Sequence, residues 1–257
     1  MTTPRAKSSF FRRLRRWCLA LALVIAFFGG ILLVAAWMMI RQSPGWWRQI
    51  DPADPAVVRA AEEIENDLVN EFHRADRPAD AATDARWASE PWALALSAPG
   101  ANAWLNTRLR PWLENQYDDF SWPEDLLEIQ VDFDAGRIVI GLRIRRGREE
   151  SQVLAARFVP RIPDDGSLWV QVERVYLGRL PMPADWVLGD ADQRLSRLLD
   201  DAVDDPGELA ALTAALAGRS ALLDEPVVRL GDGRRVRVLS IRADRGLLEI
   251  ICRTELE

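Results

Sequence analysis

The side chains that most often perform chemistry in proteins are scarce in this sequence. Its one histidine is His73, at the expected exposed end of a helix, so a Ser/His/Asp triad or a histidine-based metal centre would have to be built around that single residue. The sequence also lacks the motifs that cradle phosphate, bind dinucleotides, hold a catalytic zinc or present a nucleophilic serine. We therefore expect no catalytic centre and no cofactor.

Pairs of acidic residues are the remaining groups that could do chemistry. Two convergent carboxylates can hold Ca²⁺ or act as the acid and base of a glycosidase. Most of the pairs here fall at expected turns or helix ends, where aspartate caps backbone N–H groups and stays solvated. We interpret them as structural and expect no metal site; they are Asp118-Asp119, Asp164-Asp165, Asp190-Asp192, Asp200-Asp201 and Asp204-Asp205.

A single long apolar segment, Trp17 to Ile40, carries no charge and follows a basic tail at residues 1–16. As a helix its 24 residues extend about 36 Å, enough to cross the roughly 30 Å hydrocarbon core of a bilayer. Basic side chains before the segment outnumber those just after it. We expect a single-pass protein of the cell (inner) membrane, with a cytoplasmic N-terminus and the bulk of the chain extracytoplasmic.

A cleavable signal peptide is the competing interpretation of this segment. Signal peptides have a shorter apolar core, of roughly 7 to 15 residues, followed by small residues at the cleavage site. Here the small residues Ala35-Ala36 lie inside the core, which favours an uncleaved anchor. We expect Trp37, Trp46 and Trp47 to form an aromatic belt at the outer membrane interface.

Charge and cysteine content limit the partners and the architecture. The chain has a net charge of −6, and its first 41 residues hold seven basic and no acidic side chains, which leaves −13 on the remainder. An acidic domain of this kind repels nucleic acid, so we expect no nucleic-acid partner. Cys18 lies in the apolar segment and Cys252 near the C-terminus, so no disulfide framework is expected and the domain depends on its own core.

The periodicity of apolar residues predicts an α+β fold in which a curved antiparallel sheet packs around helices. Residues 41–91 are expected to hold a membrane-proximal amphipathic helix, Val57 to Phe72, and a polar linker. Residues 92–257 are expected to form one α+β extracytoplasmic domain. Its predicted elements are a strand at 92–96, a helix capped by Ser97 and reaching Leu113, which Pro111 limits or kinks, and a four-stranded meander from Leu127 that ends in residues 177–183. Helices at 186–203 and 209–217 and strands at 227–230, 235–241 and 247–253 follow.

Two motifs give the region from Trp92 to Leu195 a resemblance to the YpmS-like family of single-pass bacterial surface proteins. The first is LSAPGANAWL at 96–105, similar to a family pattern in which serine or threonine precedes Gln-Leu-Asn-Ala-Leu, although Gly100-Ala101 replace Gln-Leu here. The second is GRLPMP at 178–183. The resemblance implies an N-terminal anchor, a strand meander between the motifs, and a set of motif residues: Asn102, Gly178, Leu180, Pro181 and Pro183.

A looser similarity is to tubular lipid-binding (TULIP-like) domains, in which a curved sheet wraps a long helix and holds acyl chains in an apolar groove. That likeness concerns the fold and is weak evidence for function. The helix from Val57 to Phe72 has no counterpart in the YpmS-like family.

The sequence favours a binding module that holds a lipid or another apolar ligand. The sheet from Leu127 to Val172 offers a continuous apolar face, and a single helix would cover it incompletely, although the same face can be ordinary filled core. The expected groove residues are Trp104, Leu105, Leu109, Ile129, Val131, Ile140, Leu142 and Val170. The alternative is a structural or assembly factor of the cell envelope, acting through a protein partner or through self-association at Ala22, Ala26 and Gly30, whose spacing allows two helices to approach closely.

Overall fold

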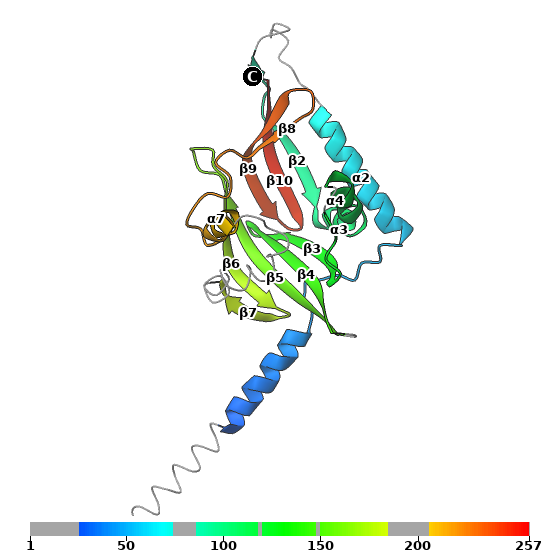
Figure 1. Cartoon of the computed structure of the whole chain (residues 1–257), viewed down its shortest axis with the longest axis vertical. Helices are drawn as coiled ribbons and strands as arrows, with labels where there is room; N and C mark the ends of the chain where they lie inside the picture. The colour runs from blue at the N-terminus through cyan, green and yellow to red at the C-terminus, as the bar shows by residue number, and fades with distance from the viewer. Residues whose placement is uncertain (1–25, 74–85, 118–119, 148–149, 185–205, 257) are drawn as a thin grey trace, which may run out of the picture.

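Two five-stranded antiparallel sheets organise the chain. The structure is a computed structural model that describes residues 26–73, 86–117, 120–147, 150–184 and 206–256. Sheet A runs in the order β1-β10-β9-β8, with β2 also paired to β10, and sheet B is a continuous meander in the order β3-β4-β5-β6-β7. Figure 1 shows sheet B next to the helix of residues 26–41 and sheet A at the far end of the molecule. The predicted α+β class with antiparallel strands is confirmed.

Ten strands form the two sheets, and five described helices accompany them. Sheet A contains β1 (Trp87–Ala88), β2 (Trp92–Ser97), β8 (Val227–Arg229), β9 (Arg234–Asp244) and β10 (Leu247–Leu256). Sheet B contains β3 (Leu126–Asp134), β4 (Arg137–Arg146), β5 (Glu150–Arg161), β6 (Trp169–Leu177) and β7 (Leu180–Pro183). Besides the helix of residues 26–41, the helices are α2 (Pro55–His73), α3 (Ala98–Thr107), α4 (Leu109–Gln116) and α7 (Pro206–Leu216).

The meander has one strand more than predicted. Residues 177–183 were predicted as the exit from a four-stranded meander, whereas residues 180–183 return as β7 and pair with β6. β7 is the last strand of the sheet, so Pro181 and Pro183 can lie there without removing hydrogen bonds from a central ladder.

The helix that begins after Ser97 is shorter than predicted. Ser97 is its N-cap, as expected, and its hydroxyl accepts a hydrogen bond from the Gly100 N–H at 3.2 Å. The helix ends at Thr107, however, and α4 begins two residues later. Pro111 explains the break, because its ring would clash with the carbonyl of Thr107 four residues earlier, while it is tolerated in the first turn of a new helix.

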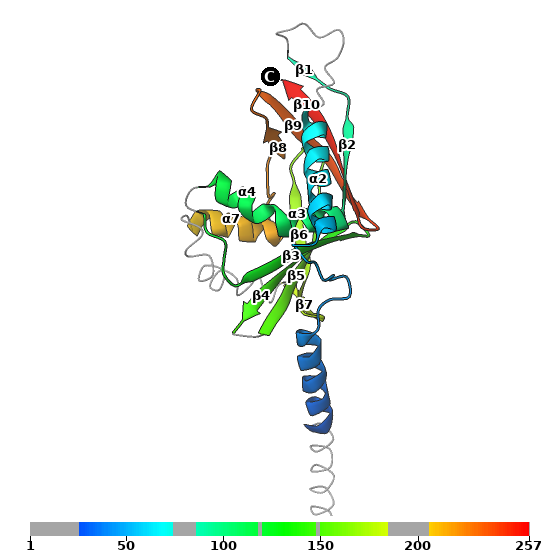
Figure 2. The ribbon, with the colours of Figure 1, turned by 90° about the vertical axis from the view of Figure 1, so that its right-hand side faces the viewer.

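The main core lies where α3 meets both sheets. Its buried residues are Ala98, Ala101, Phe133, Ala243 and Leu248. Helix α2 packs on α3 and β2, and runs alongside sheet A in Figure 2. The predicted membrane-proximal helix is therefore packed against the α+β domain.

Several predictions concern residues outside the described part of the chain. These include residues 17–25, with Ala22, the linker at 74–84 and the helix at 186–203. Within the described ranges, no helix has both the length and the apolar content needed to span a membrane.

Candidate functional site

The helix of residues 26–41 carries apolar side chains that are exposed on every side. Leu32 and Leu33 are 70% and 73% exposed, and a helix turns through all directions within four residues. The other large exposed apolar residues of this helix are Phe27, Phe28, Ile31, Val34, Trp37, Met38 and Met39. A surface of this kind needs an apolar environment or an apolar partner.

The C-terminal end of this helix rests on the turn between β6 and β7. The backbone N–H of Arg179 donates to the Met39 carbonyl at 2.8 Å, and its Nε donates to the Ser43 carbonyl at 2.9 Å. Gly178 has a φ of +60°, and a Cβ atom there would lie 2.6 Å from the Met39 oxygen and 2.7 Å from the Gln42 oxygen. Only glycine allows this approach, which gives the motif residue Gly178 a physical role.

The connecting segment, residues 42–50, is fixed to sheet B by a buried amide. Gln130 is fully buried on β3, and its side chain pairs with the backbone of Arg48 as a neighbouring strand would. Its Oε1 accepts from the Arg48 N–H at 3.0 Å, and its Nε2 donates to the Arg48 carbonyl at 2.5 Å. The segment therefore cannot leave the sheet without breaking two hydrogen bonds.

Two tryptophans of this segment pack on the sheet. The rings of Trp46 and Trp47 both lie 2.7 Å from the place that a Cβ atom on Gly141 would occupy. Trp47 is buried, and the Arg143 guanidinium lies 5.2 Å from its ring centroid. The predicted aromatic belt is therefore wrong for Trp47, because a glycine on β4 leaves a space that its ring fills. Trp37 remains exposed on the helix.

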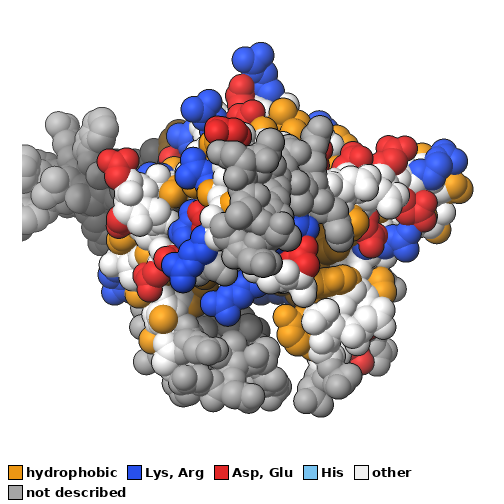
Figure 3. Space-filling view, turned by 90° about the horizontal axis from the view of Figure 1, so that it is seen from above, with side chains coloured by type: hydrophobic (Ala, Val, Ile, Leu, Met, Phe, Trp, Pro, Cys, Tyr) orange, Lys and Arg blue, Asp and Glu red, His pale blue; other side chains and the backbone are white. Residues whose placement is uncertain are grey.

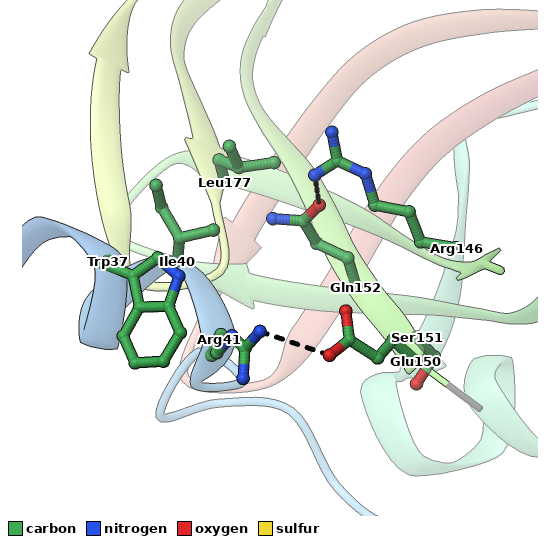
Figure 4. A pocket seen from close by; sticks show the side chains of 8 residues that line it. All are labelled: Trp37, Ile40, Arg41, Arg146, Glu150, Ser151, Gln152 and Leu177. Carbon is green, nitrogen blue, oxygen red and sulfur yellow. Dashed lines mark hydrogen bonds and ion pairs between the residues drawn. The ribbon is translucent and has the colours of Figure 1, made fainter.

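A cavity of about 800 Å³ lies between the end of the helix and the edge of sheet B. Figure 4 shows Trp37 and Ile40 of the helix on one side of it and strand residues, with Leu177, on the other. Arg41 stacks on the Trp37 ring at 4.0 Å and forms an ion pair with Glu150 at 3.1 Å. The cavity thus has an apolar wall and a charged rim.

Arginine 146 gives this rim an additional positive charge. Its Nη1 donates to the Gln152 Oε1 at 2.7 Å, which is a neutral partner. No carboxylate in the described part of the chain forms an ion pair with Arg146. Glu150 lies directly opposite Arg146 in the β4–β5 ladder and is paired with Arg41, so the described rim holds two arginines and one carboxylate.

The apolar wall continues across one face of sheet B in rows of residues that lie opposite one another in neighbouring strands. Phe133 and Val172 lie in a row with buried residues, whereas Ile140, one row nearer the helix, is 37% exposed. The row that starts at the cavity is half-buried and consists of Leu177, Leu154, Leu142 and Ile129. The next row consists of Val175, Ala156, Ile140 and Val131.

The structure brings together half of the predicted groove residues. Ile129, Val131, Ile140 and Leu142 occupy these two rows, whereas Val170 lies beyond the buried row, opposite Pro160. The helical residues Trp104, Leu105 and Leu109 are half-buried. Trp104 packs on Trp112 of α4, with ring centroids 6.4 Å apart.

Helix α3 lies along the edge of sheet B, where Asn102 and Asn106 replace a missing strand. Asn102 donates to the Val131 carbonyl at 2.9 Å and accepts from its N–H at 2.6 Å. Asn106 repeats this with Ile129, at 2.7 Å and 3.1 Å. The motif residue Asn102 is therefore structural, and the helix satisfies the edge of β3 with side-chain amides.

Two ionisable groups in the described part of the chain, Asp165 and Cys252, have pKa values that their surroundings clearly explain. Asp165 accepts from the Ser167 hydroxyl and N–H, and these bonds lower the pKa of its carboxyl. This is the turn role expected for that pair. Burial raises the pKa of the Cys252 thiol to about 11, which keeps it protonated at neutral pH. His73 is the last residue of α2, and no group of potential metal ligands occurs among the described residues.

Sequence reasoning missed the residues that join the helix to the sheet. Arg41, Glu150 and Gln130 come from separate segments, and only the fold brings them together. The apolar residues Leu127, Ile129, Val131 and Phe133 alternate with polar ones, which predicts a solvent-exposed face for Gln130. Nothing in this alternation indicates that a connecting segment covers Gln130. Comparisons of the chain with family models, with curated proteins and with solved structures found no match.

Proposed function

We propose that this protein is a single-pass membrane protein whose extracytoplasmic domain binds a phospholipid beside its own anchor. The observation that carries the proposal is the cavity between the helix end and sheet B, because its apolar wall is continuous with the half-buried rows of the sheet. An acyl chain could lie along Leu177, Leu154 and Leu142 without crossing water. Catalysis is not part of the proposal.

The place of the cavity suits a lipid drawn from the adjacent leaflet. If residues 17–40 span the bilayer, Trp37 and Arg41 lie at the level of the headgroups, where tryptophan and arginine are favoured. The helix end is fixed to the sheet by Gly178 and Arg179, so the cavity stays next to the membrane surface. Phosphate oxygens would accept hydrogen bonds from Arg146 and Arg41.

The test is photo-crosslinking of the full-length chain in vesicles. The vesicles contain phosphatidylcholine with a photoreactive group on one acyl chain, and crosslinked peptides are identified by mass spectrometry. Lipids that merely surround the anchor label residues 17–40, which serves as the internal positive control. The proposal predicts additional labels on peptides from β4, β5 and β6, because an acyl chain in the groove touches those strands.

Matched variants separate binding from general effects. Leu154→Asn places a polar group in the half-buried row and should lower labelling of the strands about fivefold, because burying an unpaired amide costs on the order of 1–3 kcal/mol. Val228→Asn makes the corresponding change on β8, away from the cavity, and should leave the labelling unchanged. Labels confined to residues 17–40 in the unaltered chain would overturn the proposal and leave the envelope assembly factor as the better prediction.

A further inference from the structure

Sheet A carries four arginines on one face at the end of the molecule opposite the helix of residues 26–41. Arg229 on β8 lies directly opposite Arg235 on β9, and Arg253 on β10 lies directly opposite Arg237 on β9. Residues that lie opposite one another in a sheet share a face, so these side chains form one group. We call Arg229, Arg235, Arg237 and Arg253 the distal arginine cluster.

The described carboxylates that pair with this cluster carry fewer negative charges than its four arginines carry positive ones. Glu255 is shared, with Arg235 at 3.3 Å and Arg237 at 3.1 Å, and Glu225 is 3.9 Å from Arg237. The Nε of Arg253 is buried and has no hydrogen-bond partner among the described residues. Like charges directly opposite one another destabilise a sheet, so two adjacent Arg–Arg pairs are a cost to folding.

The cluster stands out because the domain as a whole is acidic. Figure 3 views this end of the molecule and shows Lys and Arg side chains on both sides, with acidic side chains among them. A local positive field on an acidic protein attracts anions selectively. Arginine is also the side chain that best matches a carboxylate, through two parallel N–H donors.

We propose that the distal arginine cluster binds an extended acidic segment of a partner protein. Alternate residues of a strand are about 6.8 Å apart, and neighbouring strands about 4.8 Å apart, which sets the spacing of the guanidinium groups. Carboxylates at alternate positions of an extended chain have the same spacing. Within this sheet the carboxylate of Glu255 already binds two arginines of the cluster, Arg235 and Arg237. This inference is independent of lipid binding.

The test uses the full-length chain in a non-ionic detergent and a fluorescent peptide of alternating Thr and Glu. Its matched control is a peptide of alternating Thr and Gln. Fluorescence anisotropy should show binding of the Glu peptide alone, weakening several-fold between about 50 mM and 200 mM NaCl because the contact is electrostatic. Arg253→Gln should weaken binding about fivefold, because it removes a guanidinium without breaking an ion pair of the protein.

Two further variants distinguish binding from a structural effect. Arg161→Gln, at an exposed position at the end of β5, should leave the affinity unchanged. Glu255→Gln should tighten binding, because it removes the internal carboxylate that competes for Arg235 and Arg237. Equal binding of both peptides, or equal effects of Arg253→Gln and Arg161→Gln, would overturn the proposal. So would binding of polyphosphate in place of the acidic peptide, which would assign the cluster to phosphate polymers.

Discussion

Replacing Asn102 by alanine should destabilise the fold through the edge of sheet B. Asn102 is 7% exposed, and its amide supplies both partners of the Val131 backbone. Each lost hydrogen bond costs about 0.5–1.5 kcal/mol net, and a buried group left unpaired adds to this. For two bonds at a buried site we expect Asn102→Ala to lower the free energy of unfolding by about 2–4 kcal/mol.

The assay is urea unfolding of the full-length chain in a non-ionic detergent, followed by tryptophan fluorescence. Asn106→Ala is the comparison variant, because Asn106 makes the same pair of bonds with Ile129, and one more to the Asn102 carbonyl within the helix, but is only half-buried. Water can replace part of what is lost there, so the expected cost is about 1–2 kcal/mol.

A third variant tests the hydrogen bonds themselves. Asn102→Asp keeps an acceptor for the Val131 N–H but turns a carboxylate oxygen toward the Val131 carbonyl, so it should be destabilising at neutral pH. Protonation of the new carboxyl restores a donor, so part of the loss should be recovered in acid relative to Asn102→Ala. A change below about 0.5 kcal/mol for Asn102→Ala, with an unchanged dependence on urea, would refute this account of the sheet edge.

Three other predictions concern the helix junction and the buried thiol. Gly178→Ala should lower the midpoint of thermal unfolding more than Gly136→Ala does, because both glycines have a positive φ but only Gly178 is crowded by carbonyl oxygens. Equal shifts of the two midpoints would contradict the close approach of the helix end to Gly178. Gln130→Ala should speed tryptic cleavage after Arg48 in the native chain, because the connecting segment loses the two hydrogen bonds that fix it to β3. An unchanged cleavage rate would show that other contacts hold the segment in place. Cys252 should resist alkylation by iodoacetamide at pH 8 and should react as the pH rises toward its pKa of about 11. Mass spectrometry maps the alkylated cysteine. Rapid labelling at pH 8 would mean that the thiol is not buried. The raised thiol pKa also means that its contribution to stability is present at neutral pH and is lost as the pH rises through that value.

Most strands and the start of α3 could be predicted because they depend on local patterns. Alternation fixed β3 and β4, and a two-residue turn at Ala135-Gly136 with positive φ at both positions connects them. Ser97 followed by a proline identified the start of α3. The apolar stripe predicts one helix that Pro111 limits or kinks, whereas the structure ends the helix at Thr107 and begins another at Leu109.

The candidate site was predicted only in part, since an apolar face is visible in the sequence but its cover is not. Ile129 and Leu142 were expected to line a groove, and they do share a half-buried row. The charged rim depends on Arg41 and Glu150, which are more than a hundred residues apart and meet only because the helix end packs on the β6–β7 turn. No local signal encodes such a contact.

The sequence by itself determined the apolar segment, the scarcity of catalytic side chains and the α+β class, because these follow from residue type and a period of two or 3.6 along the chain. The tertiary structure decided which strands form each sheet, that α3 satisfies the edge of sheet B with amides, and where the helix end is fixed. Those contacts join residues distant in sequence, and their free energy depends on burial and on hydrogen-bond geometry, which exist only once the chain has folded.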